Sequence, residues 1–148
     1  MSPDVVPRLA ALRPAIKAEW TSLLRAEPAL SPMGHPDTLV FLMDETLDQL
    51  AALIRTRPSR PGLARAAPVV APLQRRCPCG LNPLLNYYAT GELAVRAAAR
   101  TLLAADLEEL LACFHLLAQR EIDTLCSVCR HRHEPYCRDS EILSGSAR

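Results

Sequence analysis

The sequence predicts an all-α protein, an antiparallel four-helix bundle, and two observations support that prediction. The first is composition: the 148 residues include 25 Leu and 22 Ala but only 11 Val and Ile and 6 aromatic residues. Leu and Ala lose little free energy in a helix, whereas strands favour β-branched and aromatic side chains. The second is that four segments repeat apolar residues at helical spacing. The length fits one domain, expected over residues 1–138, with a flexible tail at 139–148.

The first two helices are expected over residues 8–26 and 36–56. Pro14 lies inside the apolar stripe of the first, so that helix either begins near it or is kinked there. Pro36 suits the first position of the second helix, and Asp37 complements the helix dipole in its first turn. The apolar faces expected to be buried are Leu9, Leu12, Ile16, Trp20 and Leu23 in the first helix, and Leu39, Leu42, Met43, Leu47, Leu50 and Ile54 in the second.

A long Pro/Arg-rich crossover, residues 57–82, is expected between the second and third helices. Five prolines interrupt it every few residues, so it cannot be helical throughout. Between Asp48 and Glu92 there is no acidic residue, while six arginines contribute positive charge. The whole chain nevertheless has a formal net charge of only +1, and the crossover lacks interleaved aromatic residues. We therefore expect the crossover to pack on the acidic second helix rather than to bind nucleic acid.

The third and fourth helices are expected to form a hairpin over residues 82–104 and 106–129. Asn82 fits the N-cap of the third helix, and Asp106 would cap the fourth after a short turn. Gly91 is either a weak point of the third helix or a position of close packing. One uninterrupted helix of more than 40 residues is the alternative, but it would exceed the usual helix length of a compact domain.

Four cysteines lie where the two ends of this hairpin should meet. Cys77 and Cys79 stand just before the third helix, and Cys126 and Cys129 stand at the end of the fourth. The two helices are nearly equal in length, and each spans roughly 35 Å at 1.5 Å per residue. Folding back therefore brings the two pairs together. We expect the four thiolates to form a metal site at one end of the bundle, with neighbouring arginines offsetting their negative charge.

Zinc is the expected occupant, because tetrahedral zinc binds four thiolates, often as two short-spaced pairs. An iron–sulfur cluster is the second candidate since it uses the same ligands, and copper(I) would also accept the Cys-x-Cys pair. His131, His133 and Cys137 follow closely and are additional or alternative ligand candidates. Unligated thiols are the simpler alternative, and a disulfide framework fits less well in a reducing compartment. Cys113, in the middle of the fourth helix, is expected to be a buried core residue.

The cysteine pattern resembles the zinc centre of the redox-regulated holdase chaperone family. Cys77, Cys79, Cys126 and Cys129 match that motif in residue type and order. In that family four thiolates hold zinc until oxidants form disulfides and release it. The resemblance covers these four residues and implies a redox-responsive switch.

A second resemblance concerns residues 16–50, which read IKAEWTSLLRAEPALSPMGHPDTLVFLMDETLDQL. This segment, a helix with a tryptophan followed by a Leu-rich acidic helix, is similar to the helical N-terminal sensor domains of stressosome co-antagonists of the Rsb type. Those domains are regulatory and are not enzymes. The similarity implies a regulatory helical protein.

The remaining patterns indicate no enzyme. No GxSxG, P-loop, GxGxxG or HExxH motif occurs. His115 lies near the apolar face of the fourth helix, where a hydrogen-bonded core residue is expected and a haem ligand is the alternative. The first 20 residues do not have the pattern of a signal peptide, and no run of 18 apolar residues occurs. We therefore expect a cytoplasmic metal-binding regulatory or adaptor protein whose partner is another protein, not a membrane.

Overall fold

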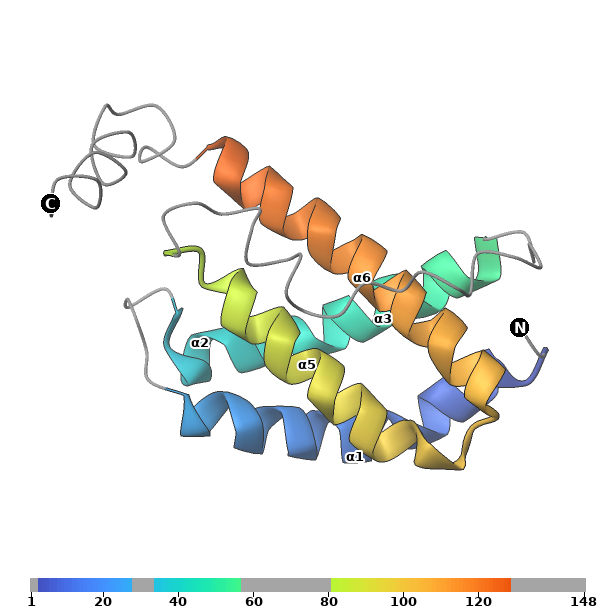
Figure 1. The fold of residues 1–148 in the computed structure, drawn as a ribbon. Coiled ribbons are helices and arrows are strands. Elements are labelled where there is room, and N and C mark those ends of the chain that lie inside the picture. The colour runs from blue at the N-terminus through green and yellow to red at the C-terminus, as the bar shows by residue number, and fades with distance from the viewer. Residues whose placement is uncertain (1–2, 28–33, 57–80, 129–148) are drawn as a thin grey trace, which may run out of the picture.

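The computed structural model describes residues 3–27, 34–56 and 81–128, and within these ranges the chain is almost entirely helical and has no strand. The predicted helical class is therefore confirmed for the described residues, including four long helices (Figure 1). The elements are α1 (Val5–Ala26), α2 (Pro36–Leu39), the 3₁₀ turn η2 (Val40–Leu42), α3 (Met43–Thr56), α5 (Leu84–Ala98), the 3₁₀ turn η4 (Ala99–Thr101) and α6 (Ala104–Ser127).

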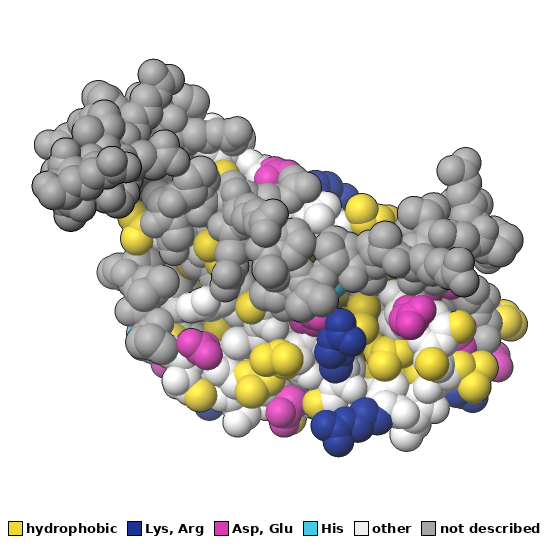
Figure 2. All heavy atoms as spheres, in the orientation of Figure 1, with side chains coloured by type: hydrophobic (Ala, Val, Ile, Leu, Met, Phe, Trp, Pro, Cys, Tyr) yellow, Lys and Arg dark blue, Asp and Glu magenta, His cyan; other side chains and the backbone are white. Residues whose placement is uncertain are grey.

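The long helices pack around one shared core. Helix α1 makes its most extensive contact with α5, α5 also packs against α6, and α3 lies against both α6 and α1. Figure 1 shows that α1 and α6 run in one direction and that α3 and α5 run in the opposite one. In the described part of the face shown in Figure 2, acidic and basic side chains lie among hydrophobic ones. None of the helices in the described ranges has the length and apolar character needed to cross a membrane.

An aromatic cluster occupies the centre of the core, where α1, α5 and α6 meet. The ring of Trp20 lies 4.6 Å from that of Tyr87 and 5.9 Å from that of Phe114, measured between centroids. The indole N–H of Trp20 donates a hydrogen bond to the Tyr87 carbonyl oxygen at 2.9 Å, which satisfies the one polar group of a fully buried ring. Gly91 makes this packing possible, because a Cβ atom there would lie 2.5 Å from the Trp20 ring. Close packing is therefore the role of this glycine.

Helix α1 begins at Val5, three residues earlier than expected, and continues through Pro14. Proline removes one backbone donor and leaves the carbonyl four residues earlier without its helical partner. Both Pro14 and Ala10 lie on the exposed side of α1, where water can satisfy that carbonyl. The helix therefore accommodates the proline in its interior.

The second predicted helix is interrupted near its start. Its first turn, α2, passes through η2 before α3 begins at Met43. The tighter 3₁₀ turn changes the angular spacing of the side chains, and Leu42, expected to be buried, is 38% exposed. The other five residues predicted for this face are buried. His35 caps α2, because its ring Nδ1 accepts a hydrogen bond from the backbone N–H of Asp37 at 3.3 Å.

The hairpin turn between α5 and α6 also differs from the prediction. It lies at Leu102 and Leu103, two residues before the expected position. Asp106 is consequently not the N-cap of α6; it lies in the first turn of that helix and is 5% exposed. Leu103 holds the cap position without a side-chain hydrogen bond. The prediction for Asp106 was wrong because the backbone leaves the helical conformation earlier, at Leu102 (ψ 156°) and Leu103 (ψ 143°), so that α6 has already begun at Ala104.

Candidate metal centre

The start of α5 and the end of α6 are in direct contact. The side-chain amide of Asn82 donates hydrogen bonds to the Sγ atom of Cys126 at 3.1 Å and to the Ile122 carbonyl oxygen at 3.2 Å. Asn82 and Cys126 are both buried, at 7% and 6% exposure. This is the juxtaposition that the matched lengths of the two helices predict.

Asn82 is held in place by the beginning of α5. Its Oδ1 atom accepts a hydrogen bond from the backbone N–H of Leu84 at 2.9 Å, which satisfies one of the unpaired donors at the helix start. The helix itself begins at Leu84, two residues later than predicted, but Asn82 acts on its first turn as a capping side chain does. Because Oδ1 faces α5, the Nδ2 donor is directed at α6. One short side chain thus joins the two ends of the hairpin.

Cys126 is the only one of the four proposed ligands that lies in the described residues. It occupies the last turn of α6. Cys77, Cys79 and Cys129 lie outside the described residues, as do the additional candidates His131, His133 and Cys137. Among the described residues alone, no group of three or more His, Cys, Asp or Glu side chains is arranged to hold a metal ion. Cys113 is fully buried in the middle of α6, as expected for a core residue.

A second polar cluster, which the sequence reading missed, lies between α5 and α6 in the core. The Oε2 atom of Glu92 lies 2.7 Å from Nε2 of His115, and the two residues are only 2% and 3% exposed. Arg96, one turn further along α5, donates to Oε1 of Glu92 from Nε at 2.9 Å and from Nη2 at 2.8 Å. The expectation that His115 is a hydrogen-bonded core residue is therefore confirmed.

These contacts keep Glu92 ionised inside the protein. Burial alone would raise the pKa of Glu92, but the hydrogen bonds from His115 and Arg96, together with their charges, bring it below its ordinary value. An ionised carboxylate can accept a proton from Nε2 of His115. Nδ1 is buried and has no hydrogen-bond partner among the described residues. The spacing of Glu92 and Arg96, four positions apart on one helix, was the available sequence signal.

Comparisons with known proteins identify no relative. No protein-family model, no curated protein and no solved structure matches this chain. The similarities to holdase chaperones and to stressosome sensor domains therefore stay expectations from the sequence. A function has to be inferred from the chemistry of the residues themselves.

Proposed function

We propose that this chain is a metal-binding regulatory or adaptor protein that holds a metal ion, zinc before any other, through Cys77, Cys79, Cys126 and Cys129. The site would lie at one end of an antiparallel four-helix bundle. The pairwise packing of α1 with α5, α5 with α6, α6 with α3 and α3 with α1 supports that arrangement.

The contact between Asn82 and Cys126 is the observation that supports the site most directly. Three residues of extended chain span at most about 11 Å. Cys79 precedes Asn82 by three residues, and Cys129 follows Cys126 by three. Cys79 and Cys129 are thus tethered within about 11 Å of the Asn82–Cys126 contact, and Cys77 lies two residues before Cys79. A tetrahedral site with metal–sulfur distances of about 2.3 Å needs that proximity.

The local electrostatics around Cys126 also favour a bound cation. The carboxyl end of a helix carries a partial negative charge, and Cys126 lies in the last turn of α6. Several thiolates gathered there would repel one another and the helix dipole unless a metal ion neutralised them. The N–H···S hydrogen bond from Asn82 orients the Cys126 sulfur and reduces its charge, as groups around a metal ligand commonly do.

The resemblance to redox-regulated chaperones gives this site a regulatory role. Hydrogen peroxide takes two electrons from a pair of thiolates, which join in a disulfide, and with two protons it is reduced to two molecules of water. The metal ion loses two ligands and leaves. Because structural zinc contributes folding free energy, its loss would loosen the end of the hairpin and signal to a protein partner.

Metal analysis of protein purified without oxygen tests the proposal. We expect about one zinc ion per chain and no visible absorption, whereas a brown protein would identify an iron–sulfur cluster. Cys77→Ser and Cys126→Ser should lower the metal content and the melting temperature. Cys113→Ala is the matched control, because this core cysteine is remote from the site and its loss should leave the metal content unchanged. Absence of metal, with both serine variants as stable as the wild type, would overturn the proposal.

Peroxide treatment separates a switch from a purely structural site. In a switch, zinc is released in proportion to the disulfides formed and is taken up again after reduction. A structural site keeps its metal through mild treatment. Zinc release can be followed with a chromogenic chelator, and the remaining thiols can be counted on the same sample.

A further inference from the structure

A cavity of about 130 Å³ lies between α3, α5 and α6, and it takes no part in the proposed metal site. Two leucines form its apolar wall, two tyrosines its aromatic wall, and the other four side chains are polar or acidic. The lining residues are Leu42, Glu45, Thr46, Gln49, Leu84, Tyr87, Tyr88 and Glu121. Its volume is well below the roughly 300–1,000 Å³ of pockets for drug-sized ligands. The cavity therefore fits one small group or one side chain rather than a cofactor.

The deep side of the cavity is buried and already ordered. The hydroxyl groups of Tyr87 and Thr46 are joined by a 2.9 Å hydrogen bond, and these residues are 0% and 5% exposed. Tyr88 is also buried, and its ring meets that of Tyr87 edge to face with centroids 5.0 Å apart. Rings fixed in this way offer oxygen atoms and π-electron density without losing further side-chain entropy on binding.

The entrance of the cavity carries more negative than positive charge. Glu45 is exposed and accepts a hydrogen bond from Gln49 at 3.1 Å, but among the described residues no cation pairs with it. Glu121 pairs with Arg120 at 3.2 Å, and Arg120 also donates to Gln49 at 3.2 Å. None of the described residues that line the cavity is Lys or Arg. Within the described part of the chain, Glu121 thus has a cationic partner and Glu45 has none.

The pKa values of the two tyrosines are raised by burial and by the nearby carboxylates. Burial raises the pKa of Tyr87 and of Tyr88 above its ordinary value. The carboxylate of Glu45 contributes to the rise for both residues, and that of Glu121 contributes for Tyr88. Burial is the main cause of these shifts, and the nearby carboxylates add negative charge that further disfavours an anion at the phenolic oxygens.

We propose that this cavity binds a single positively charged alkylammonium or alkylguanidinium group. The charged end would interact with Glu45 and with the tyrosine rings, since cations are attracted to aromatic faces. The alkyl part would contact Leu42 and Leu84. The group can belong to a free amine or to a Lys or Arg side chain of a partner protein, and the chemistry of recognition is the same for both.

Titration of ¹⁵N-labelled full-length protein with n-butylguanidinium and n-butylammonium chloride tests this proposal. We expect saturable backbone amide shifts concentrated at Thr46, Tyr87 and Tyr88, and weaker binding at high salt. n-Butanol is the neutral analogue and should cause no comparable shifts. Nα-acetyl-arginine methylamide distinguishes the two sources: it binds if the cavity accepts a protein side chain, and it fails to bind if only free amines enter.

Variants that change a single charge sharpen the test. Glu45→Gln should weaken the binding of n-butylguanidinium about fivefold, and Arg120→Gln, which releases Glu121 and Gln49, should strengthen it by a similar factor. Glu19→Gln, an exposed carboxylate on α1, is the matched control and should change nothing. Absence of saturable shifts, equal shifts with n-butanol, or affinity unaffected by Glu45→Gln would overturn the proposal. None of these outcomes depends on whether the cysteines bind metal.

Discussion

At Gly91 the core leaves no room for a side chain. In an exposed helix, replacing Gly by Ala stabilises by up to about 1 kcal/mol. At Gly91 the added Cβ would lie 2.5 Å and 2.6 Å from Trp20 ring atoms and 2.8 Å from the Phe114 ring. We therefore expect Gly91→Ala to lower the free energy of unfolding by about 1–3 kcal/mol, measured by urea denaturation.

A double-mutant cycle identifies the cause of that loss. Trp20→Leu removes the ring that the new methyl group would strike, so Gly91→Ala should cost less in the Trp20→Leu background than in the wild type. If Gly91→Ala lowers the free energy of unfolding equally in the two backgrounds, the destabilisation does not come from a clash with the Trp20 ring.

Glu92 is a second residue whose contribution to the free energy of unfolding can be measured. Glu92→Gln is expected to lower the free energy of unfolding at pH 7 by about 1–3 kcal/mol, because buried His115 and exposed Arg96 lose their charged partner. The folded-state pKa of Glu92 is lowered, so its contribution is complete above the unfolded pKa of about 4.3 and is lost as the pH falls through the folded value. The difference between variant and wild type should therefore shrink on acidification.

Urea titrations at several pH values between neutral and acidic check this dependence. Glu108→Gln, an exposed carboxylate on α6, serves as the control and should have little effect at any pH. A difference between Glu92→Gln and wild type that grows on acidification would contradict the role assigned to the carboxylate.

Helical spacing was a good guide to most buried residues and failed at specific ones. Ile16, Trp20 and Leu50 were predicted to be buried, and each is 0% exposed. Tyr87 and Glu92 are just as buried but were missed. Helix α5 contacts both α1 and α6, so it buries more than the single apolar stripe that periodicity reveals.

At the scale of elements, Asn82 closes the α5–α6 hairpin. Asn82→Ala removes the hydrogen bond to the first turn of α5 and both bonds to α6. We expect a loss of about 2 kcal/mol in the free energy of unfolding. Zinc affinity should also fall about 10- to 100-fold, because the Cys126 sulfur loses the group that orients it.

Asn86→Ala is the matched control for this prediction. Asn86 is half-buried near the start of α5, and its side chain makes no hydrogen bond within the described residues. This variant should keep both the stability and the zinc affinity of the wild type, as measured by urea denaturation and chelator competition. Similar losses in the two variants would show that Asn82 has no special part in closing the hairpin.

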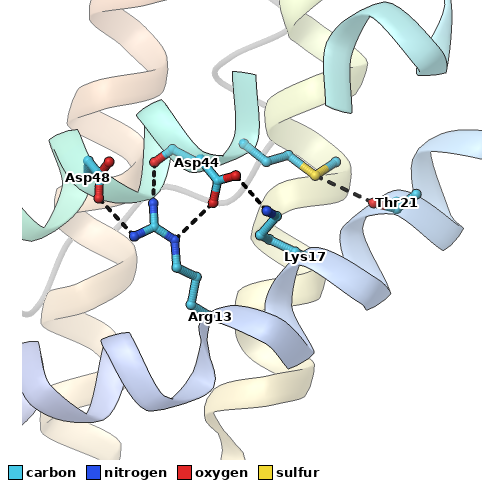
Figure 3. Close-up of polar contacts among 6 residues, drawn as sticks. Arg13, Lys17, Thr21, Asp44 and Asp48 are labelled. Atoms are coloured by element: carbon cyan, nitrogen blue, oxygen red, sulfur yellow. Dashed lines mark hydrogen bonds and ion pairs between the residues drawn. The ribbon is translucent and has the colours of Figure 1, made fainter. Parts of the chain in front are cut away.

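An ion-pair network joins α1 to α3 at the surface (Figure 3). Arg13 binds Asp44 at 3.1 Å and Asp48 at 2.8 Å, and Lys17 binds Asp44 at 2.6 Å. The hydrogen bond from Lys17 and the charges of Lys17 and Arg13 lower the pKa of Asp44. The stabilising effect of this carboxylate is therefore present at neutral pH and is lost in acid.

Asp44→Asn should lower the melting temperature slightly at low ionic strength and less at high ionic strength, since exposed ion pairs are screened by salt. Glu19→Gln, on α1 and without an ion pair among the described residues, should cause no such change. Thermal melts of both variants at low and high salt make the comparison. A loss that is independent of salt would indicate that Asp44 acts through packing instead.

At the scale of the whole molecule, the helical class and the meeting of the hairpin ends could be read from composition and helix length. The helix boundaries could not, because they depend on local competition. Leu103 rather than Asp106 holds the N-cap position of α6, and a 3₁₀ turn exposes Leu42. The cavity between α3, α5 and α6 could not be predicted from the sequence either, since its lining comes from separate helices that are far apart along the chain.

The central claim is that four cysteines from two distant parts of the chain hold one metal ion. X-ray absorption at the metal edge, on full-length protein purified without oxygen, measures the identity of that ion and its ligands together. We predict zinc with four sulfur ligands at about 2.3 Å, reduced to about three in Cys126→Ser. A metal bound only by nitrogen and oxygen, or no stoichiometric metal at all, would contradict the claim.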